Sequence, residues 1–308
     1  MNSSFNKKIV AITAGDPEGI GPEIIEKSLE KLNPDCPVLV VGKREYFKKD
    51  LFNKVTCPED IEKNGLYILE PEISEEDPSF SFVKEATGFA LEGKISGIVT
   101  APINKEKWIR SGNLYMGHTD YFIKTTGVKE WSMFFWSGDI KTALYTTHIP
   151  LKDVFSRLNT EDLVRFCRFV HSELKRLTKK DFTVFVSGLN PHAGEGGNIG
   201  MEEIEIISPA VELLKKEFVI SGPHPPDTVF LKARSIPDSV VISLYHDQGL
   251  IAFKLLKVNS GVNVTLGLPF VRTSPDHGTA YDISGKGIAD PGSMIESIKL
   301  AIKFASLT

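Results

Sequence analysis

Short apolar runs rich in β-branched residues alternate with helix-like segments through the N-terminal part of the chain. The strand-like and helix-like members of each pair are 9–15 and 22–32, 37–42 and 43–52, and 97–101 and 104–112. Strands that alternate with helices favour parallel pairing, because each helix returns the chain to the same end of the sheet. The alternation therefore predicts an α/β fold with a largely parallel sheet.

The middle of the chain departs from this alternation. Residues 133–139 and 141–148 are two strand-like runs joined by a short Gly-Asp turn, a pattern that predicts a hairpin. We expect a second α/β domain to begin there, so that residues 1–130 with 256–308 form one domain and 131–255 the other. Further predictions are a helix at 160–178 with Thr160 as N-cap, a strand at 182–189, a helix at 201–216, and a last helix starting at Pro291.

Charge and cysteine content exclude several classes of protein. The net charge of −4, with no basic stripe, argues against a nucleic-acid-binding surface. The polar N-terminus leads directly into a strand, with no apolar segment long enough for a signal peptide or membrane span. Cys36, Cys57 and Cys167 have neither disulfide nor zinc spacing, and Cys167 lies in a helical pattern as a core residue. We therefore predict a cytoplasmic protein that binds neither nucleic acid nor membranes.

Three histidines stand in compact polar motifs after strand-like runs. They are His148 in Tyr-Thr-Thr-His, His192 in Leu-Asn-Pro-His and His246 in Tyr-His-Asp-Gln. The carboxyl ends of strands are where α/β sheets build their sites, and imidazole suits Zn²⁺ and similar ions. For each histidine alone the alternative is an ordinary polar residue that closes a strand, but three together favour a metal site. Asp247 is a candidate accessory ligand or proton acceptor, or it only orients His246.

Two glycine-rich segments and several cations are less specific. Residues 13–23 and 194–200 lack the dinucleotide-binding spacing, and 13–23 lacks the Lys-Ser/Thr of a P-loop, so a dinucleotide would not be held by the usual Rossmann loop. Lys105, Lys254 and Arg272 stand beside polar turns, which suggests an anionic substrate, although each of these charges can equally be a solvated surface group. The polar block 263–291 has little periodicity and is typical of a binding loop.

Motifs across the chain resemble those of the 4-hydroxythreonine-4-phosphate dehydrogenase family. In the family's order they are TAGDPEGIGPE, TAPINK, GHTDYF, TTHIPL, LNPHAGEGG, GPHPPDTVF, YHDQGL and VNVTLGLPFVRTSPDHGTA. In addition, GDPEGIGPE and HGTAYDISGKGIADP resemble the N-terminal motif and the cofactor loop of the wider isocitrate and isopropylmalate dehydrogenase group. The resemblance runs from Thr13 to Pro291 and implies the fold of that group, two α/β domains with a cleft between them.

The resemblance also implies an activity. It is the NAD- or NADP-linked oxidation of 4-phosphooxy-L-threonine to 2-amino-3-oxo-4-phosphooxybutanoate, which decarboxylates to 3-amino-2-oxopropyl phosphate in pyridoxal 5′-phosphate biosynthesis. A divalent ion (zinc, magnesium or cobalt) and a homodimer with its active site at the subunit interface are implied as well. One alternative is a related dehydrogenase of 4-phospho-threonate, 4-phospho-erythronate or a cyclic dihydrodiol. The more remote one is a non-catalytic anion-binding protein.

Carried over motif by motif, the resemblance assigns roles to individual residues. It implies the metal ligands His148, His192 and His246, which are the three histidines that the strand ends indicate. It implies the substrate-binding residues His118, Thr119, Lys254, Asn263 and Arg272, with Asp247 and Lys254 as catalytic candidates, and the cofactor-binding residues Asp276, His277, Gly278, Thr279, Asp282 and Asp290. Departures from the family pattern at His224, Pro226, Trp131 and Trp136 would reshape the pocket wall.

Overall fold

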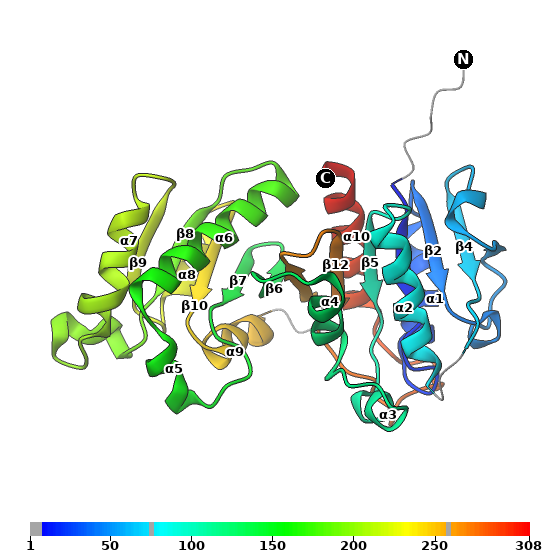
Figure 1. Cartoon of the computed structure of the whole chain (residues 1–308), viewed down its shortest axis with the longest axis horizontal. Coiled ribbons are helices and arrows are strands. Elements are labelled where there is room, and N and C mark those ends of the chain that lie inside the picture. Colours follow the sequence, from blue (N-terminus) through cyan, green and yellow to red (C-terminus); the bar gives the residue numbers. More distant parts are fainter. Residues whose placement is uncertain (1–7, 74–76, 257–259) are drawn as a thin grey trace, which may run out of the picture. The chain divides into compact units, whose positions relative to one another are not determined.

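The computed structural model describes residues 8–73, 77–256 and 260–308 (Figure 1). The chain divides into two compact units: unit 1 is Met1–Trp131 with Leu268–Thr308, and unit 2 is Ser132–Gly267. Each unit is a β-sheet packed against helices, which confirms the predicted α/β class. The polar segment predicted before the first strand, residues 1–7, lies outside the described residues.

Unit 1 is built on strands in the order β3-β4-β2-β1-β5-β12, all paired in parallel. Their bounds are β1 Val10–Thr13, β2 Pro37–Val41, β3 Asn53–Lys54, β4 Gly65–Leu69, β5 Gly97–Thr100 and β12 Val271–Pro275. Every residue of β1, β2 and β5 is buried, as expected for parallel strands covered on both faces. The predicted βαβ alternation is confirmed here.

The helices of unit 1 follow the apolar patterns of the sequence. They are α1 Gly21–Leu32, α2 Pro78–Leu91, α3 Lys105–Arg110, α4 His118–Thr126 and α10 Gly292–Leu307, with short 3-10 turns at Arg44–Tyr46 and Pro58–Asp60. α10 packs on β5 and β12 and contacts α1, whereas α2 packs on β1, β2 and β5. The helix predicted at 43–52 is wrong. Only the 3-10 turn Arg44–Tyr46 forms. The Arg44 side chain donates to the Phe47 carbonyl, and the backbone of Phe47 is extended, so the helix does not continue.

Unit 2 has strands in the order β11-β6-β7-β10-β8-β9. Their bounds are β6 Ser132–Ser137, β7 Ile140–Leu144, β8 Thr183–Ser187, β9 Ile220–His224, β10 Ser239–Ser243 and β11 Val262–Leu266. β6 is antiparallel to β7 and β11, so the predicted hairpin is confirmed. The remaining pairs, from β7 to β9, are parallel. Because β11 pairs with β6, the chain stays in unit 2 through Gly267, later than the predicted return at residue 256.

The helices of unit 2 correct several predicted boundaries. They are α5 Leu151–Arg157, α6 Thr160–Thr178, α7 Ser208–Leu214, α8 Val229–Arg234 and α9 His246–Leu256. The N-cap of α6 is Asn159 rather than Thr160, because the Asn159 side chain accepts from Asp162 N. The predicted helix 201–216 is a π-helical turn, Glu203–Ile207, followed by α7. Cys167 is a core residue as predicted, and burial raises the pKa of its thiol to about 12.

No helix within the described part of the chain is both long and apolar enough to cross a membrane.

Candidate functional site

Three neighbouring parallel strands of unit 2 each lead into one of the predicted histidines. β10 lies between β7 and β8 and pairs in parallel with both, so all three strands end at one edge of the sheet. His148 follows β7, His192 follows β8, and His246 opens α9 directly after β10. The structure therefore places all three histidines at the carboxyl edge that the sequence predicted for them.

Two of these histidines are neighbours. The ring centroids of His148 and His246 are 5.5 Å apart. Asp247 Oδ1 lies 2.7 Å from His246 Nδ1, a hydrogen bond that leaves Nε2 as the nitrogen able to bind an ion. The geometry favours the orienting role among the alternatives for Asp247. His192 is different: its side chain is 65% exposed, and its Nδ1 lies 3.5 Å from Glu195.

The described part of one copy does not assemble a complete set of ligands. Within the described ranges, no three or more His, Cys, Asp or Glu side chains form a group that could hold a metal ion. The structure thus brings His148 and His246 together and leaves His192 outside their pair.

A buried cation and a partly buried histidine form a second cluster, in unit 1. Arg272, on β12, is only 3% exposed, and its Nη2 donates to Thr100 Oγ1 at 2.8 Å. Its guanidinium carbon lies 5.8 Å from the centre of the Phe122 ring. His118, the first residue of α4, packs edge-on against Trp108 with ring centroids 5.4 Å apart.

The electrostatics of this cluster suit an anion. Burial, with Arg272 and Lys105 nearby, holds the pKa of His118 well below its usual range, so its imidazole is neutral. Among the described residues, the buried Nε2 of His118 has no hydrogen-bond partner. Burial lowers the pKa of Arg272 to about 10, which leaves it cationic at neutral pH. This cluster can bind a phosphate or carboxylate. It offers the Arg272 cation, the His118 nitrogen that lacks a partner among the described residues, and the N-terminal turn of α4, which includes Thr119.

The other two predicted substrate-binding residues belong to unit 2. Asn263, on β11, has a buried Oδ1 for which the described residues supply no hydrogen-bond partner. Lys254 is exposed in the last turn of α9, the helix that begins with His246. A buried amide oxygen without a donor costs free energy, so it is a candidate acceptor for a ligand group.

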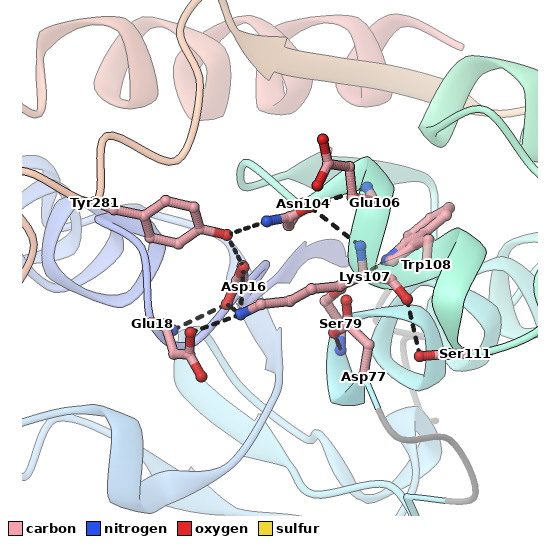
Figure 2. Close-up of polar contacts among 10 residues, drawn as sticks. All are labelled: Asp16, Glu18, Asp77, Ser79, Asn104, Glu106, Lys107, Trp108, Ser111 and Tyr281. Carbon is pink, nitrogen blue, oxygen red and sulfur yellow. Dashed lines mark hydrogen bonds and ion pairs between the residues drawn. The ribbon is translucent and has the colours of Figure 1, made fainter.

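The predicted cofactor-binding block packs against the glycine-rich segment from the other end of the sequence. The Tyr281 hydroxyl donates to the carboxylate of Asp16, which is fully buried, and Asn104 Nδ2 donates to the same hydroxyl at 2.7 Å (Figure 2). Lys107 Nζ lies 3.0 Å from Asp16 and 2.8 Å from Glu18. We call these five residues the Asp16 network.

Main-chain hydrogen bonds also join the predicted cofactor-binding block to the glycine-rich segment and the helix that follows it. Ile20 N donates to Thr279 O at 2.9 Å, and a Cβ added at Gly19 would lie only 2.9 Å from that oxygen. Further along, Glu23 accepts from Gly287 N and Ala289 N. Of the remaining predicted cofactor residues, Asp276 N donates to Ser293 Oγ, Asp290 accepts from Gly292 N, and His277, Gly278 and Asp282 are exposed. The block is thus anchored to unit 1 while part of it faces solvent.

Sequence reasoning did not single out Asp16, Lys107 or Tyr281 as members of a site. The signal that could have found them was weak. Asp16 and Tyr281 lie inside the two motifs that resemble the isocitrate dehydrogenase group, but nothing in the sequence indicates that these motifs meet.

Removal of the Tyr281 hydroxyl should destabilise unit 1. In Tyr281→Phe the buried Asp16 carboxylate loses one donor, so we expect the free energy of unfolding to fall by about 1–3 kcal/mol. Urea denaturation followed by circular dichroism measures this change. The matched control is Tyr115→Phe, in which the ring stacked on Phe80 is kept; there we expect a change below about 0.5 kcal/mol. Equal effects of the two substitutions would contradict the role of the network.

The chain is similar to known proteins in both sequence and architecture. A model of the family described as pyridoxal phosphate biosynthetic protein PdxA matches residues 36–301. The chain is 41% identical to 4-hydroxythreonine-4-phosphate dehydrogenase of Sulfurihydrogenibium sp., over 95% of this chain and 97% of that relative. It is 39% identical to D-threonate 4-phosphate dehydrogenase of Pectobacterium atrosepticum, over 97% of this chain and 99% of that relative.

Solved structures extend the likeness. The crystal structure of 4-hydroxythreonine-4-phosphate dehydrogenase from Klebsiella pneumoniae matches with a TM-score of 0.86 and 37% identity, covering 98% of this chain and 99% of that one. Isocitrate dehydrogenase from Methylococcus capsulatus matches with a TM-score of 0.51 and 12% identity, covering 96% of this chain and 85% of that one, a likeness of fold alone. The predicted isocitrate dehydrogenase-like fold is confirmed.

Proposed function

Because the chain belongs to the pyridoxal phosphate biosynthetic protein PdxA family, we propose that it oxidises 4-phosphooxy-L-threonine at its 3-hydroxyl and releases CO₂. NAD⁺ or NADP⁺ would supply the hydride acceptor, the hydroxyl proton would leave, and the product would be 2-amino-3-oxo-4-phosphooxybutanoate. Loss of CO₂ then yields 3-amino-2-oxopropyl phosphate. The observation that carries the proposal is the pair of buried Arg272 and His118, whose Nε2 is buried, as a site for an anionic group in a chain with relatives named for this substrate.

The substrate is held by its charged ends. Arg272 supplies a rigid donor fork that suits phosphate or carboxylate, and the desolvated surroundings strengthen its attraction for an anion. Neutral His118 can donate from Nε2 without adding charge, and Thr119 adds the first-turn hydroxyl of α4. Lys254 and Asn263 are the other substrate-binding residues in this proposal. In this scheme Lys254 or Asp247 accepts the proton of the hydroxyl that is oxidised; Asp247 would do so with the carboxylate oxygen that its bond to His246 leaves available.

We further propose that His148, His192 and His246 hold a divalent ion such as zinc, magnesium or cobalt. Two imidazoles already lie side by side in one copy, and Asp247 orients one of them, which fits the donor set of such an ion. When bound, the ion supplies Lewis-acid polarisation of a substrate oxygen. Because one copy does not group all three histidines among its described residues, His192 comes from a second copy of the chain.

Exposed apolar side chains support a homodimer that completes the site. They follow each histidine in turn: Leu151 and Phe155 after His148, Ile199, Met201 and Ile204 after His192, and Ile251 and Leu255 after His246. Large exposed apolar groups on neighbouring segments mark protein–protein interfaces. A twofold-symmetric dimer would cover these segments and supply each active site with residues from both copies.

The block at the carboxyl end binds the nicotinamide cofactor in this proposal. Asp276, His277, Gly278, Thr279, Asp282 and Asp290 are its contact residues. The Asp16 network and the Ile20–Thr279 hydrogen bond hold the block in place, while its exposed residues are available to a ligand. A dinucleotide-dependent biosynthetic reaction of this kind belongs in the cytoplasm.

The test is a comparison of substrates. Purified protein with Co²⁺, NAD⁺ and 4-phosphooxy-L-threonine should form NADH and CO₂ in equal amounts, because a 3-oxo group β to a carboxylate is set up to decarboxylate in place. Absorbance at the NADH band and CO₂ trapping follow the two products. We expect kcat/KM for D-threonate 4-phosphate to be lower by about tenfold to a hundredfold, the scale of one altered polar contact.

The other outcomes separate the alternatives. The 39% identity to a D-threonate 4-phosphate dehydrogenase makes that substrate the second candidate. Preference for it would move the chain to the sugar-acid branch. NADH without CO₂ would instead point to a dihydrodiol-type reaction, and no turnover of any of these substrates would reopen the non-catalytic alternative.

A further inference from the structure

The loop that carries His192 has a left-handed backbone. All residues from 192 to 197 have a positive φ, and three of them are not glycine: His192 at 53°, Ala193 at 55° and Glu195 at 46°. Residues with a Cβ rarely adopt this conformation unless their surroundings impose it. Contacts outside the loop must therefore hold the backbone from which the His192 side chain projects.

The buried carboxylate of Glu203 provides such contacts. Glu203 is 2% exposed, and its Oε1 accepts from Leu189 N at 2.7 Å and from Asn190 N at 2.8 Å. Its Oε2 accepts from Asn190 Nδ2 at 2.9 Å. A Cβ added at Gly194 would lie 2.7 Å from the same Oε2, so the loop closes directly over the carboxylate. One side chain thus bonds the loop before His192 and lies in close contact with it after His192.

Gln248 connects this loop to the segment that carries His246. Its side-chain oxygen accepts from Leu244 N at 2.7 Å, and its side-chain nitrogen donates to Gly188 O at 2.8 Å. Gly188 directly follows β8 and precedes the residues that are bonded to Glu203. Leu244 directly follows β10 and lies just before His246. A single buried amide therefore spans the ends of two parallel strands.

The segment that leads to His148 is tied to the same point. Thr146 Oγ1 donates to Leu244 O at 2.7 Å, and Thr146 N donates to the same oxygen at 3.3 Å. Leu244 is therefore bonded through its N–H to Gln248 and through its carbonyl to Thr146. All three strand ends that bear a histidine share one buried hydrogen-bond chain.

We propose that Glu203 and Gln248 are positioning residues that hold the His192 loop and the His246 segment in place before an ion binds. The inference rests on the proposed function, since it takes these histidines as metal ligands. Neither residue is assigned contact with the ion or the substrate. Their effect is on the arrangement of the imidazoles, so losing them should weaken metal binding much more than it weakens folding.

Glu203→Gln and Gln248→Met test this. In Glu203→Gln an NH₂ group replaces one carboxylate oxygen, so it must face one of the N–H groups that now donate to Glu203. Gln248→Met keeps a similar side-chain volume but loses the hydrogen bonds to Leu244 N and Gly188 O. We expect the Kd for Co²⁺, titrated into metal-free protein and followed by visible absorption, to rise about 10- to 100-fold in each variant. Glu202→Gln is the matched control. Its carboxylate also contacts Asn190 Nδ2, at 2.7 Å, but bonds neither Leu189 N nor Asn190 N, so its Kd should stay within about twofold.

A readout without metal separates positioning from general destabilisation. Hydrogen exchange of the amides in 188–197 of the metal-free protein should accelerate in Glu203→Gln and stay unchanged in Glu202→Gln, while exchange in β1 and β2 stays the same in both. Turnover of the two positioning variants should recover at saturating Co²⁺. Unaltered Co²⁺ affinity and loop exchange in both variants would overturn the inference.

The same titration distinguishes this failure from a failure of the proposed function. If His246→Ala loses Co²⁺ while Glu203→Gln and Gln248→Met bind it normally, only the positioning role is refuted. If His246→Ala binds Co²⁺ like the native protein, the metal site itself is refuted and the inference falls with it.

Discussion

An equimolar mixture of the inactive variants His192→Ala and His246→Ala, dissociated and reassembled, should regain about one quarter of native turnover under twofold symmetry. The proposal draws His148 and His246 from one copy and His192 from the other. Half of the reassembled dimers are then mixed, and each mixed dimer contains one complete site and one that lacks two ligands. The measurement is NADH formation by the reassembled mixture.

Each variant alone should lose bound metal and lower kcat by about 10³-fold or more, because the ion supplies several kcal/mol to the reaction. The matched control is a mixture of His148→Ala with His246→Ala. These residues are neighbours in one copy, so every site in every dimer lacks a ligand and no activity should return. Recovery in the control mixture, or none in the test mixture, would contradict the shared site. Native metal content in His192→Ala would contradict the ligand assignment.

Arg272→Ala should raise KM for the phosphorylated substrate about 10- to 100-fold, the scale of a lost charge-assisted hydrogen bond of about 1.5–3 kcal/mol. Arg272→Lys should recover little of this, because an ammonium cannot keep the bond to Thr100 and also present a fork to the anion. The KM for NAD⁺ should change little. Steady-state kinetics with each substrate varied in turn measures both constants.

The control for charge removal is Arg110→Ala in the same unit. Arg110 is exposed and forms a long ion pair with Glu106, at 3.6 Å, so neither KM should change by more than about twofold. If the KM for NAD⁺ alone rose in Arg272→Ala, Arg272 would belong to the nucleotide site instead. The division of the block from Asn263 to Asp290 between substrate and cofactor would then be wrong.

Features that depend on neighbouring residues could be predicted from the sequence. The alternation of apolar runs with helical patterns identifies β1, α1 and β2, and the Gly-Asp turn identifies the β6–β7 hairpin. The positions of His148, His192 and His246 after their strands follow from the same local periodicity. Each of these conclusions requires only that a residue type and its near neighbours favour one backbone conformation.

Predictions failed where a local pattern admits two outcomes. Asn159 and Thr160 are both good N-caps, and only the extended backbone of Asn159 selects it. Residues 43–52 have a helical pattern, yet Arg44 N bonds the carboxylate of Glu70, a residue of another segment, and the helix does not form. A tertiary hydrogen bond of this kind outweighs a weak local propensity.

The sequence by itself determined which residues carry the chemistry, because histidine, arginine and glycine-rich motifs are recognisable wherever they stand. Only the tertiary structure decided which of them meet. Asp16 and Tyr281 are joined across nearly the whole chain, and Glu203 reaches back to the loop of His192. It also separated His192 from the His148–His246 pair. Such contacts depend on how whole strands and helices pack, and the order of residues along a chain contains no distances between segments far apart in it.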